Sequence, residues 1–286
     1  LTRDTYTGEE DEPESLHLYT YCYNDPVMYM DITGNRPTIS VSKPVPTLKP
    51  KPAPKMPGPT PRPGPAPPDT RGFTYPGFDQ TAAQAFLKAT RWKRATKSEM
   101  LIATKNYEKN KKIEKEVLRN QGKEKYITNQ SKLTELRFGT SNMGNAGCEL
   151  IAIYNAILLK EGKKISLSKL IYQCEISGYT ALTGQWGTNP YRIGKLITKS
   201  GMNYTAIKSR FNLKMKKGGV FIVSFWNSKN ILKGIHTIAI KVKSKNRIKS
   251  YNDVYSDSSK TVKGTFKKLL KNRPFIIGYK MKGRRK

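Results

Sequence analysis

The chain has 286 residues, of which 36% are hydrophobic, and its formal net charge is +32. This hydrophobic fraction lies below the roughly 45–50% of ordinary globular proteins, so a substantial segment is expected to lack a core of its own. Three widely spaced cysteines argue against a disulfide framework, and the sequence shows neither a Cys/His metal cluster nor an apolar run long enough to cross a membrane. We expect no cofactor and no metal.

Residues 1–35 are acidic and rich in tyrosine, with eight acids and one base. The alternation of apolar residues over 16–23 predicts a short strand that runs into a turn at Asn24-Asp25-Pro26. So few residues cannot bury a core, so they are expected to complete a fold whose other strands lie upstream. Because the chain begins at Leu1 rather than at a methionine, we expect it to be part of a longer protein.

This stretch resembles the end of an RHS/YD-repeat core, in which the last repeat has a long tyrosine-rich signature closed by Asp-Pro-x-Gly. The matching positions are Leu16, Leu18, Tyr19, Tyr21, Asn24, Asp25, Pro26, Val27, Tyr29, Asp31 and Gly34. Ile32 occupies the place where the family usually has proline. The resemblance implies a secreted shell protein whose variable C-terminal segment is a polymorphic toxin. Such a toxin acts in interbacterial competition, is delivered into the cytoplasm of a target cell, and is neutralised in the producer by a cognate immunity protein.

Residues 36–71 and residues 72–137 differ in composition, and each composition predicts a different kind of structure. Fourteen of the 18 prolines fall between Pro37 and Pro76, so 36–71 is expected to be an extended, semi-rigid linker. Residues 72–137 contain many lysines and helix formers, which predicts helices with a narrow apolar stripe and a cationic face. That face would suit RNA, a membrane surface or an acidic immunity protein, and it is equally typical of a solvated helix.

Residues 138–286 carry the strongest core signals. Apolar periodicity predicts helices over 147–162, 166–176 and 189–201, and β-branched runs predict strands over 218–226, 235–242, 247–253 and 274–281. Helices followed by strands indicate an α+β domain rather than a parallel α/β sheet. Cys174, within the second helix, is expected to be a core residue.

Cys148 and His236 are the residues in this domain best suited to chemistry. Cys148 follows a glycine-rich loop at the start of the first helix, where free N–H groups and the helix dipole stabilise a thiolate. The chain has two histidines, and His17 lies in the tyrosine-rich stretch, so His236 is the candidate base. Glu149, next to the cysteine, favours the helix N-terminus electrostatically.

A hairpin links His236 to a candidate orienting residue. If Lys243-Ser244-Lys245 form its loop, Ile240 opposes Ile248 and His236 opposes Asn252 on the same face, with Cβ atoms about 4.5–5.5 Å apart. Asn252 would then hold the imidazole in the required tautomer. A slip of one residue would substitute Asp253.

This arrangement resembles the papain-like cysteine peptidases in their compact bacterial C39-like forms, over roughly residues 138–286. The order Cys148, His236, Asn252 matches the family, in which the cysteine begins the central helix and the histidine and Asn/Asp follow on an antiparallel sheet. The resemblance implies that Asn142, six positions before the cysteine, contributes to the oxyanion hole in place of the usual glutamine. Residues expected to line the substrate cleft are Gly147, Trp186 and Trp226.

The sequence thus predicts a secreted antibacterial toxin acting as a cysteine-dependent hydrolase or acyl transferase, of the protease, deamidase or transglutaminase type. Its expected partners are an acidic immunity protein, a protein substrate or RNA in the target cell, and the upstream RHS shell. Two alternatives stay open. The basic surface also suits a ribonuclease toxin that uses His236, and a binding module without catalysis would leave both residues as packing.

Overall fold

A computed structural model of the chain describes residues 29–30, 38–39, 75–90, 94–120, 125–253, 261–271 and 273–284. The chain divides into two compact units, Leu1–Pro63 and Gly64–Lys286. In the first unit, the two-residue strands β1 (Tyr29–Met30) and β2 (Thr38–Ile39) pair in antiparallel fashion. The other residues of the tyrosine-rich signature, His17, Cys22 and most of the proline-rich linker lie outside the described residues.

The second unit is built around a six-stranded antiparallel sheet in the order β5-β10-β6-β7-β8-β9. Four strands correspond to predicted runs, whereas β5, directly after a helix, and β9 were not predicted. The C-terminal strand β10 lies inside the sheet, between β5 and β6. The strands are β5 (Met202–Ile207), β6 (Val220–Trp226), β7 (Ile235–Ser244), β8 (Arg247–Tyr251), β9 (Thr261–Lys263) and β10 (Phe275–Arg284).

Most of the helices precede the sheet in the chain, which confirms the α+β class predicted from the order of the elements. The helices are α1 (Gln80–Ala89), α2 (Lys97–Arg119), α3 (Met143–Ala146), α4 (Cys148–Glu161), α5 (Leu167–Ile176), α6 (Ile193–Lys199) and α7 (Phe266–Leu270). Single 3-10 turns lie at η3 (Gln130–Leu133), η4 (Leu182–Gly184), η5 (Pro190–Arg192), η6 (Arg210–Asn212) and η7 (Ile231–Lys233), and a small hairpin joins β3 (Arg137–Phe138) to β4 (Ser141–Asn142). None of the described helices is both long and apolar enough to span a bilayer.

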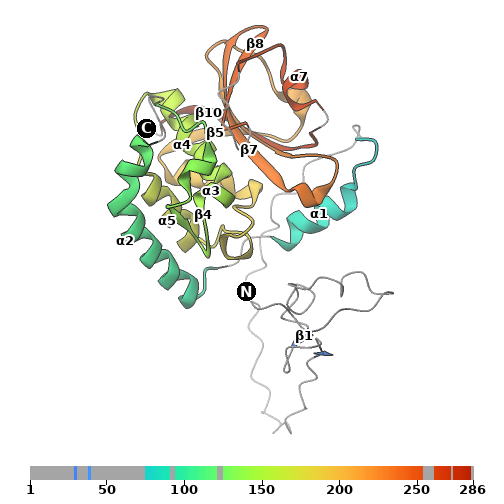
Figure 1. The fold of residues 1–286 in the computed structure, drawn as a ribbon. Helices are drawn as coiled ribbons and strands as arrows, with labels where there is room; N and C mark the ends of the chain where they lie inside the picture. The colour runs from blue at the N-terminus through green and yellow to red at the C-terminus, as the bar shows by residue number, and fades with distance from the viewer. Residues whose placement is uncertain are drawn as a thin grey trace, which may run out of the picture. The chain divides into compact units, whose positions relative to one another are not determined.

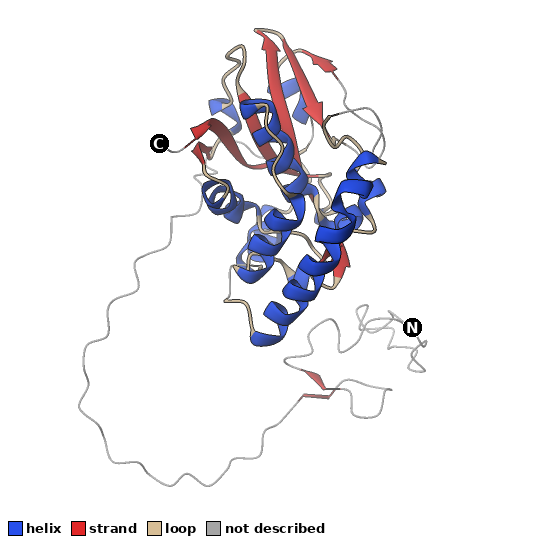
Figure 2. Cartoon of the chain, turned by 90° about the vertical axis from the view of Figure 1, so that its left-hand side faces the viewer, coloured by secondary structure: helices blue, strands red, loops and turns tan. Residues whose placement is uncertain are grey.

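The sheet separates two hydrophobic cores, because successive strand residues point to opposite faces. On β6, Ile222 packs in the core that contains α4, whereas Phe221 and Val223 pack in the core that contains α7. Figures 1 and 2 show the larger helices gathered on the α4 side of the sheet. The central helix α4 is buried along almost its whole length and ends at Gly162, whose φ of 71° suits glycine.

The basic helix α2 belongs to this unit, and the helical prediction for 72–137 is confirmed over α1 and α2, whereas residues 125–137 form loops, a 3-10 turn and the start of the short strand β3. Thr96 and Glu99 form a capping box at its start. Its inner face packs on α5, where the rings of Tyr107 and Tyr172 lie 4.8 Å apart and Asn106 donates to the Glu175 carboxylate at 2.8 Å. The cationic face of α2 therefore points away from the core.

Candidate active site

Cys148 is the first residue of α4, and the local sequence explains why the helix begins there. Gly147 ends α3 and caps α4 without a side-chain hydrogen bond. A Cβ atom at this position would lie 2.6 Å from the main-chain oxygen of Met143, so a larger residue would push α3 away. Gly147, predicted to line a substrate cleft, is instead buried in this turn.

The thiol of Cys148 lies in a closed environment, with only 5% of the residue exposed. Burial raises the pKa of the thiol well above its ordinary value, and the neighbouring Glu149 carboxylate raises it further. A hydrogen bond with the main chain of Thr237, on β7, lowers the pKa of the thiol. At neutral pH the thiol is therefore protonated, and a base must remove its proton before it reacts.

Glu149 is the acidic group next to the thiol, and sequence reasoning gave it no chemical role. It is buried, its Oε2 atom makes no hydrogen bond, and burial raises the pKa of the carboxyl from 4.5 to about 7. A Cβ atom at Gly187 would lie 2.8 Å from this Oε2 and 2.9 Å from the oxygen of Ala146. The loop containing Gly187 thus closes directly over the residues on either side of Cys148.

His236 lies at the start of β7, one residue before Thr237. Alternation along the strand puts its side chain on the face of Ile238 and Ile240, and its ring centroid lies 6.0 Å from that of Phe225. The side chain of Thr237 lies on the opposite face of the sheet, together with that of Ser224, and α4 covers this face. Within the described part of the chain, no hydrogen bond joins Cys148 to His236.

The Nε2 atom of His236 is 2.6 Å from the main-chain oxygen of Asn252. Burial lowers the pKa of His236, while the Asn252 carbonyl and the Asp253 carboxylate raise it and Arg273 lowers it. Asp253, the alternative orienting residue, forms an ion pair of 2.6 Å with Arg273. Asn252 therefore meets the imidazole through its main chain rather than through its side chain.

The predicted hairpin register is wrong by two residues. Ile240 pairs with Ser250 and Val242 pairs with Ile248, because β7 continues to Ser244 and the turn is the dipeptide at 245–246. Asn252 consequently lies beyond the paired part of β8. Its left-handed backbone, with φ of 58°, brings its carbonyl to His236.

Gln130 is the residue of this region that sequence reasoning missed. It is fully buried and makes two hydrogen bonds with the Asn252 side chain, while its own side-chain Nε2 donates to the Gly144 oxygen at 2.9 Å. Gln130 and Asn252 are 122 positions apart, and no local pattern marks either as a partner of the other.

Asn142, predicted to stabilise an oxyanion, caps helix α3. Its Oδ1 atom accepts a hydrogen bond from the main-chain nitrogen of Asn145 at 3.0 Å. The side chain is half-buried, six positions ahead of Cys148. This cap fixes the turn that leads into the cysteine.

The two tryptophans predicted to form cleft walls are bridged by α1. Phe86 lies with its ring centroid 5.2 Å from that of Trp186 and 5.7 Å from that of Trp226. Asn189 fastens the end of α1 by donating to the main-chain oxygens of Leu87 and Thr90, each at 3.1 Å. Helix α1 thus occupies the place where an open cleft was predicted.

Cys174 is fully buried in α5, with its Sγ atom 3.2 Å from the hydroxyl oxygen of Thr188. Its prediction as a core residue is confirmed. Burial raises the pKa of this thiol above its usual range. It offers a matched comparison for Cys148, since both are buried and free.

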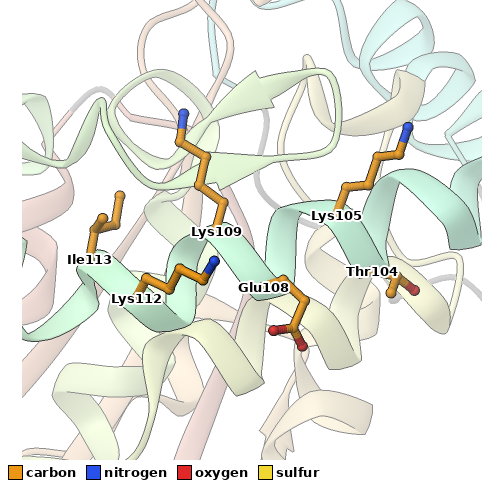
Figure 3. Close-up of a pocket in the computed structure, with 6 residues that line it drawn as sticks. All are labelled: Thr104, Lys105, Glu108, Lys109, Lys112 and Ile113. Carbon is orange, nitrogen blue, oxygen red and sulfur yellow. The ribbon is translucent and has the colours of Figure 1, made fainter.

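An open hollow of about 470 Å³ lies on the outer face of α2, away from these residues. Three of its lining residues are Lys105, Lys109 and Lys112, and Figure 3 shows Lys105 and Lys109 extending to the same side of the helix. None of these lysines forms an ion pair with a described acidic residue. The hollow is therefore a cationic surface feature.

No protein-family model matches the chain, and no curated protein matches it at a significant level.

Proposed function

We propose that the second unit is a cysteine-dependent hydrolase or acyl transferase with a papain-like arrangement. The observation that carries this proposal is that Cys148, at the first turn of the buried central helix, contacts the main chain of Thr237, the residue next to His236. Thiol catalysis needs a base within reach of the thiol, and this helix N-terminus lies beside the strand that bears His236.

The proposed reaction begins with proton transfer from the Cys148 thiol to His236. Because Nε2 donates to the Asn252 carbonyl, the neutral ring has its basic lone pair on Nδ1. This step requires Nδ1 to come within reach of the Cys148 thiol when substrate enters, while Nε2 keeps its hydrogen bond to the Asn252 carbonyl. The thiolate then attacks the acyl carbon of the substrate, which gives a tetrahedral oxyanion.

The oxyanion would accept hydrogen bonds from the main-chain N–H of Cys148 and from the Asn142 side chain. Its collapse breaks the bond to the leaving group, which takes the proton from the imidazolium and leaves a thioester on Cys148. Water or a second amine then attacks the thioester and regenerates the thiol. The same sequence of steps serves peptide cleavage, deamidation and transglutamination.

We further propose that the chain is a polymorphic toxin effector, secreted as part of an RHS shell and delivered into a target cell. The tyrosine-rich signature at 16–34, the proline-rich linker and the strongly basic remainder of the chain support this proposal. An acidic immunity protein would complement the net charge of +32.

A ribonuclease is the second candidate, and the lysines of α2 are the observation that favours it. Lys105, Lys109 and Lys112 line one hollow and form no ion pair with a described acidic residue, which suits contact with phosphates. In that case His236 would take part in proton transfer and Cys148 would be dispensable.

The deciding experiment is induced expression of the 286-residue chain in a bacterium, with growth and RNA integrity scored together. Cys148→Ala is compared with Cys174→Ala, which removes the other buried free cysteine. The thiol enzyme predicts growth arrest with intact RNA, abolished by Cys148→Ala and by His236→Ala but kept by Cys174→Ala. RNA cleavage that persists in Cys148→Ala would establish the ribonuclease instead. If neither the parent chain nor any variant arrests growth or cleaves RNA, the result would favour a binding module without catalysis.

A further inference from the structure

Gln130 lies between the two halves of the candidate site. Its main-chain nitrogen donates to Asn252 Oδ1 at 3.0 Å, and its Oε1 accepts from Asn252 Nδ2 at 3.1 Å. Its Nε2 donates to the main-chain oxygen of Gly144 at 2.9 Å. Gln130 is completely buried, so these hydrogen bonds are shielded from competition with water.

Asn252 is the residue through which Gln130 reaches the histidine. Its backbone adopts the left-handed conformation, which asparagine tolerates better than most residues but which is still less favourable than the right-handed one. The paired amides of Gln130 and Asn252 stabilise this conformation. In this conformation the Asn252 carbonyl accepts the Nε2–H of His236 at 2.6 Å.

Gly144 is the residue through which Gln130 reaches the cysteine. It lies in α3, the single turn of helix that is followed by Gly147 and Cys148. A Cβ atom at Gly144 would lie 2.6 Å from the Thr134 side chain, so α3 packs closely on the segment that carries Gln130. The same glutamine therefore restrains the entry to α4 and the partner of the imidazole.

We infer that Gln130 is a positioning residue that fixes His236 and the Cys148-bearing helix relative to one another. It acts through Asn252 and Gly144 and touches neither reacting group. The catalytic part of this inference rests on the proposed thiol chemistry, whereas the hydrogen-bonded link to His236 does not.

Asn155 provides the matched control. Asn155 is also fully buried. It binds the segment that leads to Gln130, with hydrogen bonds of 2.9 and 2.7 Å to the main chain of Ile127. It makes no described contact with Asn252 or Gly144. Asn155→Ala should therefore weaken the fold to a similar degree without releasing the imidazole.

The test follows the Nε2–H proton of His236 by NMR in the full chain carrying His17→Gln, so that a single histidine remains. Gln130→Ala is expected to speed exchange of this proton about tenfold, which is the effect of losing the one buried hydrogen bond that its side chain makes to Asn252. Asn155→Ala should change the exchange less than about twofold. Equal exchange in Gln130→Ala and the parent chain would overturn the inference.

Asn252→Gly guards against a Gln130 variant that fails to fold. Glycine accepts a φ of 58° and keeps the carbonyl, but it removes the amide that Gln130 holds. If Gln130 acts through Asn252, the double variant should exchange no faster than Asn252→Gly alone, which already removes both hydrogen bonds to Gln130. Additive effects would show that Gln130 acts by another route.

A growth assay of the same variants separates this inference from the proposed enzyme. Gln130→Ala should reduce killing in step with the loss of the protected proton, and Asn155→Ala should not. Full toxicity of Cys148→Ala would refute the proposed thiol enzyme. The exchange of the His236 Nε2–H proton is measured in other variants, so that outcome would not decide the role of Gln130.

Discussion

The imidazole of His236 donates through Nε2 to the main-chain carbonyl of Asn252 over a distance of 2.6 Å. A carbonyl oxygen only accepts, so this contact selects the Nε2–H tautomer and leaves Nδ1 as the basic nitrogen. In the proposed enzyme, the orienting role that papain-like enzymes give to a side chain would be carried by a backbone group. Substitution of the Asn252 side chain therefore does not by itself remove the acceptor.

His236 should titrate below its ordinary value of 6.5, because burial lowers its pKa. The folded state thus binds fewer protons than the unfolded state as the pH falls from 6.5 toward the folded pKa. The stability contributed by the neutral ring is present above 6.5 and is lost through that window. NMR titration of the His17→Gln chain measures this pKa directly, and a value above 6.5 would contradict the burial of the ring.

Glu149→Gln should stabilise the protein at high pH. Burial raises the pKa of this carboxyl to about 7, so the stability of the folded state is full below 4.5 and falls as the pH rises through 7. The uncharged amide escapes that loss, and the variant should gain on the order of 3 kcal/mol relative to the parent between pH 4 and pH 8. Urea unfolding at the two pH values checks this, with exposed Glu135→Gln as the control. A constant difference between variant and parent would refute it.

Gly187→Ala should be far more damaging than Gly201→Ala, although the two glycines have similar φ values of 76° and 78°. An added Cβ at Gly201 meets nothing within 4 Å, so only the backbone term of about 1 kcal/mol applies. At Gly187 it would lie 2.8 Å from the Glu149 carboxylate, which adds about 1–3 kcal/mol of overpacking. Thermal unfolding of both variants measures the gap, and equal losses would mean that the loop does not close over Glu149.

Phe86→Ala should make the Cys148 thiol easier to reach. Phe86 packs α1 against Trp186 and Trp226. Trp186 is followed by Gly187, which lies against Glu149 and Ala146 on either side of the Cys148–Gly147 turn. Loosening α1 is expected to raise the rate of iodoacetamide labelling at Cys148 about tenfold, as follows from about 1.4 kcal/mol of lost packing. Mass spectrometry reads the label, with Cys174 as the internal reference and exposed Gln84→Ala as the control variant. Unchanged labelling would show that α1 does not restrict access.

Local patterns predicted the elements well and the contacts between them less well. Helix α4 was predictable because its apolar residues and its two flanking glycines all lie within one stretch of sequence. The hairpin register was missed because a bulge between Val242 and Ser244 allows a two-residue turn that strand propensity does not reveal. Asn252 was found, but for its side chain rather than for its carbonyl.

The contacts that escaped prediction join distant parts of the chain. Gln130 is 122 residues from Asn252, and Asn189 is 102 residues from Leu87, whose carbonyl it binds. A single sequence carries no local signal for such pairs. For the same reason the predicted cleft between the tryptophans was filled by α1, an element assigned to a separate region.

The position of β10 has a consequence for how the molecule is made. Among the described strands, β5 pairs only with β10, and β10 separates it from β6. As the chain leaves the ribosome, β5 emerges well before its partner, and the sheet cannot close until the last strand is synthesised. A ribosome that stalls anywhere before Phe275 therefore releases a chain whose sheet lacks its bridging strand. Because the proposed site depends on that sheet, any chemistry at it should begin only after β10 has been synthesised.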